Sequence, residues 1–410
     1  MRLTLFTTLA MCVALVGSAS AIDNLVFHLS DDLVQSDDLV QPTSFGSDQK
    51  SGADQKSDCD NCGSKGGGKG GKGGCSCYPF GPDEAFALSS GCNRFGVKIG
   101  GWTQVGYHNR NSYADGFLQN QDNVNLHQQW FYAERAADGS CGWDWGFRFD
   151  AVYGVDGDNT QAFGNNPGVW DFQNGFDHGA YAWALPQLYV ELAKGDLSVK
   201  LGHFFTLGGY EVVPATGNFF YSHAFTMNQS EPFTHTGAIA TYNVNDNVTA
   251  YAGWTLGWDT GFDQFGNGSN WLGGVSLAVC ENATLTYIST GGDFGLRSGG
   301  RDDSYSHSVV LDLSVTDRLN YVLQSDMLDL DGIETIGINQ YLLFALNDCW
   351  GVGARVEWWK FDGQSFNAAT FGVNYKPHAN LVLRPEVKQE WIPGQGLDQA
   401  IFGMDAILVY

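Results

Sequence analysis

Residues 383–391 alternate ionisable side chains with mostly apolar ones, so the ionisable groups share one face of a strand. These ionisable residues are Arg384, Glu386, Lys388 and Glu390. Burying four such groups in a dry core would cost several kcal/mol each unless they were paired. We therefore expect this face to look into water inside a barrel, and the apolar face to look towards lipid.

A second group of titratable residues lies in and beside residues 207–233, which connect two strand-like segments. The group consists of Glu211, His223, Glu231 and His235. The connection is about 26 residues long, and structureless connections of that length are usually functional. Because it is rich in Tyr and Phe, we expect it to fold into the barrel and narrow the lumen. The alternative is that it caps the outer mouth and leaves its charges solvated.

If the connection folds inward, its titratable groups face basic residues on the inner faces of the strands. We expect these basic residues to be Arg148, Lys200, Arg355 and Arg384, and we expect Glu386 and Lys388 to line the same pore. Opposed rows of charge would create a transverse field that favours polar solutes over apolar ones.

The sequence does not favour an enzyme. It contains no Gly-x-Ser-x-Gly elbow and no His-Glu-x-x-His motif, and its isolated histidines (His203, His223, His235 and His307) lack evident catalytic partners. Asp302, Asp303, Asp329 and Asp331 could contribute oxygens to a Ca²⁺ site, but they lack the spacing of a known calcium motif. We therefore expect no cofactor and no metal, and interpret these residues as an acidic rim that gives a mild cation preference.

Composition limits the class of protein further. The chain has 410 residues, a formal charge of −24 and a pI near 4.4, which argues against nucleic-acid binding. Its mean hydropathy of −0.19 is compatible with a membrane barrel, whose apolar residues are hidden by alternation. The 13 Trp, 17 Tyr and 27 Phe suit the aromatic girdles of such a barrel, although a large β-core would also use them.

The N-terminal part differs from the rest of the chain. Residues 1–21 have the charge, the apolar core and the small-residue cleavage site of a signal peptide, so we expect export. Residues 22–92 are acidic, then rich in Gly and Lys, and we interpret them as a flexible periplasmic arm. Cys59, Cys62, Cys75 and Cys77 could bind metal, but in an exported protein disulfides are the simpler interpretation.

From residue 93 to residue 410, segments with a period of two predict a barrel of about 16 strands, each near the length that crosses a bilayer at a tilt. The expected strands are 94–107, 123–135, 142–154, 184–193, 197–206, 234–243, 248–258, 270–280, 283–290, 304–316, 318–329, 333–346, 350–361, 366–376, 379–391 and 399–410. Short connections alternate with longer ones, as in outer-membrane barrels. The last strand would be an exposed edge unless it paired with the first and closed the barrel.

Four further cysteines, Cys92, Cys141, Cys280 and Cys349, are expected at the periplasmic ends of the strands. A bridge between Cys92 and Cys141 is geometrically conceivable. Cys280 and Cys349 would be too far apart on the ring to bridge each other.

Three motifs carry a resemblance to a known family. They are Gly209-Tyr210-Glu211, Asn218–Ser222 with the sequence Asn-Phe-Phe-Tyr-Ser, and Pro232–Gly237 with the sequence Pro-Phe-Thr-His-Thr-Gly. In these motifs the chain resembles the OmpL-like β-barrel porins of outer membranes, over roughly residues 93–410. The resemblance implies a pore for small solutes and supplies no catalytic residues.

These observations together predict an all-β transmembrane barrel in the cell outer membrane, in contact with its lipid. The expected function is passive diffusion of small hydrophilic solutes or ions, and a homotrimer is expected from fold-level analogy. Two alternatives stay open: a structural or adhesive barrel that binds a partner through its outer loops, and a soluble secreted β-protein such as a lectin.

Overall fold

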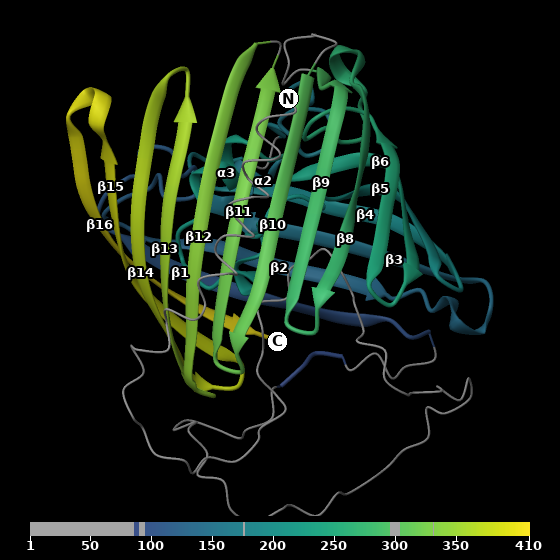
Figure 1. Ribbon diagram of the computed structural model, residues 1–410, viewed down its shortest axis with the longest axis horizontal. Coiled ribbons are helices and arrows are strands. Elements are labelled where there is room, and N and C mark those ends of the chain that lie inside the picture. The colour runs from purple at the N-terminus through teal and green to yellow at the C-terminus, as the bar shows by residue number, and fades with distance from the viewer. Residues whose placement is uncertain (1–85, 90–94, 175–176, 296–303, 331) are drawn as a thin grey trace, which may run out of the picture. The chain divides into compact units, whose positions relative to one another are not determined.

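The computed structural model describes residues 86–89, 95–174, 177–295, 304–330 and 332–410, and its strands form one closed barrel (Figure 1). The strands are β1 (Lys98–His108), β2 (Val124–Arg135), β3 (Asp144–Gly154), β4 (Ala182–Lys194), β5 (Leu197–Phe205), β6 (Thr234–Asn245), β7 (Val248–Thr255), β8 (Ser269–Cys280), β9 (Ala283–Asp293), β10 (Ser304–Thr316), β11 (Leu319–Leu330), β12 (Ile333–Asn347), β13 (Trp350–Phe361), β14 (Gln364–His378), β15 (Leu381–Ile392) and β16 (Leu397–Val409). The expected strand number and antiparallel barrel are confirmed.

Short helical segments occupy some of the connections. The α-helices are α2 (Val155–Thr160) and α3 (Phe225–Gln229), and the 3₁₀ turns are η2 (Gly139–Cys141), η3 (Ala215–Gly217), η4 (Phe265–Asn267) and η6 (Pro393–Gln395). None of the described helices is long and apolar enough to cross a membrane.

The two ends of the barrel sequence pair with each other, as expected for the last strand. In the β1–β16 ladder, Trp102 lies opposite Val409 and His108 lies opposite Gly403. The backbone amide of Gly101 also donates to the carbonyl of Tyr410, at 2.9 Å. Every strand therefore has two neighbours, which removes the exposed edge that an open sheet would have.

The period of two in the sequence corresponds to an apolar outer face and a buried inner face. On β15, Val387 is 47% exposed, whereas Arg384 and Lys388 are 2% and 0% exposed. On β3, Trp145 is exposed and Arg148 is buried. The outer faces suit a lipid environment, since the polar backbone groups of the strands are satisfied within the ring.

The interior is packed more densely with side chains than we expected from the sequence. Buried apolar side chains on the inner faces of β1 and β2, led by Trp102 and Trp130, pack with residues of the long connections such as Phe117, Val213 and Met227. Trp102 and Trp130 stack with ring centroids 4.6 Å apart. An apolar cluster therefore occupies the β1–β4 side of the barrel, and further apolar clusters lie on the inner faces of β5–β9 and β10–β12.

Several expectations concern residues outside the described ranges. These are the signal peptide 1–21, nearly all of the arm 22–92 with Cys59, Cys62, Cys75 and Cys77, and also Cys92, Asp302, Asp303 and Asp331. Of the described cysteines, Cys141 and Cys349 are disulfide-bonded, while Cys280 is a free, exposed thiol.

Candidate functional site

The connection between β5 and β6, residues 206–233, runs through the inside of the barrel. It meets inner-face residues on opposite sides of the ring: the carbonyl of Val213 accepts from Gln128 on β2 at 2.8 Å, and the amide of Gly209 donates to the Ser308 hydroxyl on β10 at 3.1 Å. Figure 1 shows α3, a part of this connection, within the ring of strands. The alternative of a cap over the outer mouth with solvated charges is therefore wrong. We call residues 206–233 the lumen segment.

Arg355 on β13 is the centre of the contacts between the lumen segment and the wall. Its guanidinium lies 2.6 Å from a Glu211 carboxylate oxygen and 2.7 Å from one of Glu357. It also donates to the carbonyl and the hydroxyl of Ser222, at 2.8 and 2.9 Å. All of these side chains are buried, so protein groups replace the water that a buried charge needs.

The ionisable row on β15 is likewise paired rather than solvated. Arg384 binds Asp405 with two nitrogens, Glu386 accepts from the backbone amides of Tyr221 and Ser222, and Lys388 lies 3.3 Å from Glu390. The expectation that these residues face water is wrong, because the lumen segment and β16 supply their partners.

Glycines of the wall receive the aromatic residues of the lumen segment. A Cβ atom on Gly353 would lie 2.5 Å from the ring of Phe219, and one on Gly372 would lie 3.0 Å from the ring of Phe220. A Cβ on Gly403 would lie 2.9 Å from Tyr221. The missing side chains leave room for these rings, so the wall and the segment are complementary in shape.

Tyr221 joins a chain of buried polar side chains that sequence analysis did not identify. Its hydroxyl lies 2.6 Å from Nε2 of His127 and 3.2 Å from Nδ1 of His108, and Nδ1 of His127 lies 2.7 Å from Asp156. The β1–β2 register moves from Gln104 opposite Gln128 to Val105 opposite Leu126, which leaves His127 as the extra residue of a bulge. A bulge interrupts the period of two, so alternation could not place His127 inside.

Burial shifts the pKa of several residues in the connections. It raises the pKa of Asp115, which the nearby Lys388 partly offsets, and it lowers the pKa of His223 to about 4. Burial and then the neighbouring Asp326 carboxylate raise the pKa of Glu231. Gln324 donates to both carboxylates, at 2.5 Å to Glu231 and 2.7 Å to Asp326. These shifts favour neutral His223 and protonated Glu231.

Three of the predicted site residues lie away from Arg355. Arg148 pairs with Glu134 and Asp150, Lys200 lies over the ring of Tyr189, and His235 packs beside Thr206. The predicted transverse field across water is also wrong for Glu211 and Arg355, because these groups are in direct contact.

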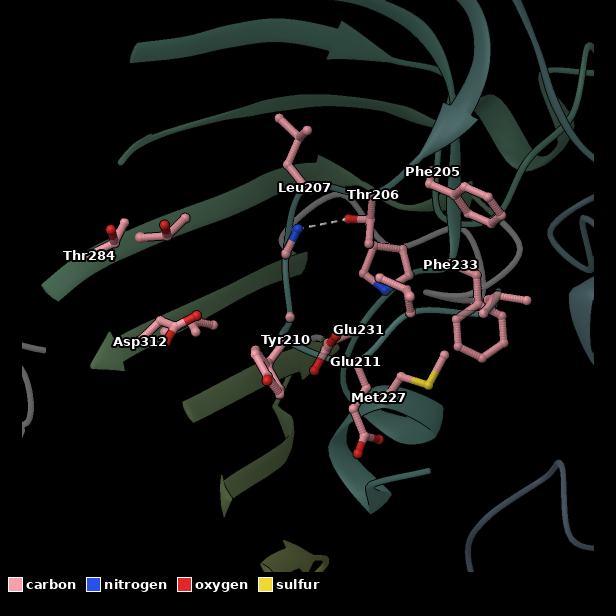
Figure 2. Close-up of a pocket in the computed structure, with 17 residues that line it drawn as sticks. Phe205, Thr206, Leu207, Tyr210, Glu211, Met227, Glu231, Phe233, Thr284 and Asp312 are labelled. Carbon is pink, nitrogen blue, oxygen red and sulfur yellow. Dashed lines mark hydrogen bonds between the residues drawn. The ribbon is translucent and has the colours of Figure 1, made fainter. Parts of the chain in front are cut away.

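A cavity of about 130 Å³, partly open to solvent, separates the start of the lumen segment from the wall (Figure 2). Thr284, Thr286, Val310 and Asp312 of β9 and β10 form one side. Figure 2 shows Thr284 and Asp312 across from Phe205, Phe233 and Met227. No Lys, Arg or His is among the described residues that line the cavity. It is therefore an acidic and partly apolar space.

The described residues show no arrangement for metal chemistry. No group of three or more His, Cys, Asp or Glu side chains among them is placed to hold a metal ion. The geometry can hold a segment inside a barrel and leave a cavity beside it.

Comparison with known proteins agrees with this architecture. The profile of the family described as beta-barrel porin-2, OmpL-like, matches residues 96–409. A mutant of the Rhodopseudomonas blastica porin is 13% identical, with a TM-score of 0.52 over 77% of this chain and 100% of that one. The outer membrane channel DcaP of Acinetobacter baumannii is 9% identical, with a TM-score of 0.51 over 77% of this chain and 97% of that one. At such identities the likeness concerns the fold alone. No curated protein matched the sequence.

Proposed function

Since the chain belongs to the OmpL-like β-barrel porin family over residues 96–409, we propose that it is an outer-membrane porin for small hydrophilic solutes or ions. The observation that carries this proposal is the closed ring with an apolar outer face and a connection folded through its interior. Solutes would diffuse passively through the space that the lumen segment leaves free.

The passage would run along the cavity at β9 and β10. The opposite, β1–β4 side is packed with apolar side chains, so little room is left there. Glu211 and Glu231 line the cavity from the lumen segment and Asp312 lines it from β10. His223, Arg355, Arg384, Glu386 and Lys388 would set the width of the constriction by holding the segment in place.

The acidic lining supports a preference for cations. Fixed carboxylates in a narrow, low-dielectric passage raise the local concentration of counter-ions. A reversal potential measured in a KCl gradient would report this directly, with cation selectivity expected and anion selectivity as the contradicting result.

The proposal includes a location in the outer membrane and assembly as a homotrimer. A signal peptide in residues 1–21 would direct export, residues 22–92 would form a periplasmic arm, and the exposed apolar side chains of the strands would contact outer-membrane lipid. Assembly as a homotrimer can be tested by the mass of the detergent-solubilised protein.

Single-channel recording in planar bilayers tests the function. Stepwise conductance in KCl is expected from the purified full chain and not from detergent alone. The dry β1–β4 side of the interior favours the second candidate, an occluded structural or adhesive barrel. A folded barrel that inserts and carries no current would support that candidate over the porin.

A further inference from the structure

One carboxylate in the cavity belongs to no ion pair within the described part of the chain. Asp312 lines the cavity from β10 and takes part in none of the ion pairs among the described residues. Glu211 is neutralised by Arg355 at 2.6 Å, and Glu231 shares Gln324 with Asp326. Asp312 is therefore the cavity carboxylate that lies outside these contacts.

The rest of the cavity is mostly apolar and contains an unsatisfied hydroxyl. Its apolar lining includes Phe205, Leu207, Val213, Met227, Phe233 and Val310. Tyr210 is only 7% exposed, and its hydroxyl has no hydrogen-bond partner. The carboxylates of Asp312 and Glu211 add to the effect of burial in raising the pKa of Tyr210, so the phenol lies in the field of Asp312.

We propose that this cavity binds amphipathic organic cations, with a protonated amine at Asp312 and the hydrocarbon part against the apolar lining. The inference rests on the proposed porin function and names the class of solute that the passage retains. A carboxylate in a partly desolvated site attracts an ammonium strongly, and nearby aromatic rings add to that attraction. An inorganic cation would gain the attraction to the carboxylate but not the apolar contacts, and an anion would be repelled.

Three probes of similar shape separate these contributions: 2-phenylethylammonium, neutral 2-phenylethanol and anionic 3-phenylpropanoate. Binding to the detergent-solubilised full chain is measured by titration calorimetry, and block of the KCl current is measured in bilayers. We expect saturable binding and block by the ammonium, and at least about tenfold weaker effects of the alcohol and the carboxylate.

Two variants assign the site. Asp312→Asn should weaken binding of the ammonium at least about tenfold, because it removes the charge and keeps the shape. Asp317→Asn is the matched control, since Asp317 lies exposed in the turn after the same strand. Val310→Thr, which preserves volume, should weaken binding of 2-phenylethylammonium about threefold and leave that of methylammonium unchanged.

Equal binding of the three probes, or an unchanged affinity of Asp312→Asn for the ammonium, would overturn the inference. If the protein is not a porin, no KCl current is observed, but the calorimetric titration still shows whether the cavity binds the ammonium. The two measurements therefore separate the proposed function from the inference. A normal KCl current with no selective binding of the ammonium contradicts the inference alone.

Discussion

At the scale of residues, the buried charges of β13 and β15 depend on partners that the lumen segment provides. Arg355 contacts Glu211 and Glu357, and Lys388 donates to the carbonyl of His223. Removing one member of such a network leaves the others buried and unpaired, which costs more than the intact network contributes.

Replacing Arg355 with Ala should therefore destabilise the barrel by about 3–5 kcal/mol, because Glu211 and Glu357 lose their cation. Denaturant unfolding in detergent, followed by tryptophan fluorescence, measures the loss. Lys360→Ala is the control, since Lys360 is exposed at the end of the same strand. Equal midpoints for the two variants would contradict the role given to Arg355.

The Tyr221 hydroxyl should matter for the position of the lumen segment. Tyr221→Phe removes the contacts to His127 and His108 and leaves buried ring nitrogens unsatisfied, at a cost of about 1–3 kcal/mol. We expect faster proteolytic cleavage within residues 206–233 and noisier single-channel currents. Tyr242→Phe, on the exposed outer face of β6, should change neither measurement.

His223 should make the docking of the lumen segment sensitive to acid. Its pKa falls from 6.5 to about 4 on burial, so a displaced segment takes up a proton below pH 6.5 that the docked segment does not. This contribution to docking is complete above pH 6.5 and is lost progressively down to about pH 4. At pH 5 the loss amounts to about 2 kcal/mol, which lowers the ratio of docked to displaced states about 30-fold.

The raised pKa values of Asp115 and Glu231 have the opposite sign, since protonation of these groups favours the docked state. The comparison of the wild type with His223→Gln isolates the histidine. When the pH is lowered from 7 to 5, the channel-opening frequency should rise more in the wild type than in this variant. The same pH dependence in both proteins would contradict the assignment.

Sequence reasoning located some of these residues and missed others for physical reasons. Alternation placed Arg355, Arg384, Glu386 and Lys388 on inner faces, because their outward neighbours are apolar. Alternation could not show that Arg148 forms ion pairs with neighbouring carboxylates or that Lys200 lies over the ring of Tyr189, since these contacts depend on the register between strands. His127 was missed because it lies at a bulge.

At the scale of elements, the strands were the predictable part and the lumen segment was only partly so. Each strand is long enough to show several periods of alternation, and its ends are marked by Gly, Asp and Asn. The inward course of residues 206–233 was indicated by its aromatic composition. The place where this segment packs could not be predicted, because the glycines that receive its aromatic rings lie on strands far away in the sequence.

A wall glycine should control the depth of the lumen segment. Gly353→Ala places a methyl group 2.5 Å from the Phe219 ring, so the ring must move away from the wall into the lumen and the passage should narrow. We expect a measurable decrease in single-channel conductance with the barrel still folded, as judged by heat-modifiable migration on gels. Gly394→Ala has its nearest neighbour at 3.6 Å and should leave conductance unchanged. Identical conductance in both variants would contradict this account of the wall.

At the scale of the whole molecule, the closure of the barrel and the packing of its interior depend on different contacts. The ring closes through the ladder between β1 and β16. The filling depends on apolar packing around Trp102 and Trp130 and on the ion pairs of Arg355 and Arg384. A barrel of this strand number would otherwise enclose an aqueous channel, so the lumen segment decides how much of the channel remains.

Replacing Thr216–Gln229 with a Gly–Ser linker of equal length tests this separation. The linker spans the same gap but cannot form the contacts of Phe219, Phe220 or Tyr221, so the barrel should assemble and its conductance should rise severalfold. The uncovered cations keep their carboxylate partners on the wall, and Glu386 loses the amides of Tyr221 and Ser222, so the preference for cations should persist. Unaltered conductance in a correctly folded variant would mean that the segment does not limit the pore.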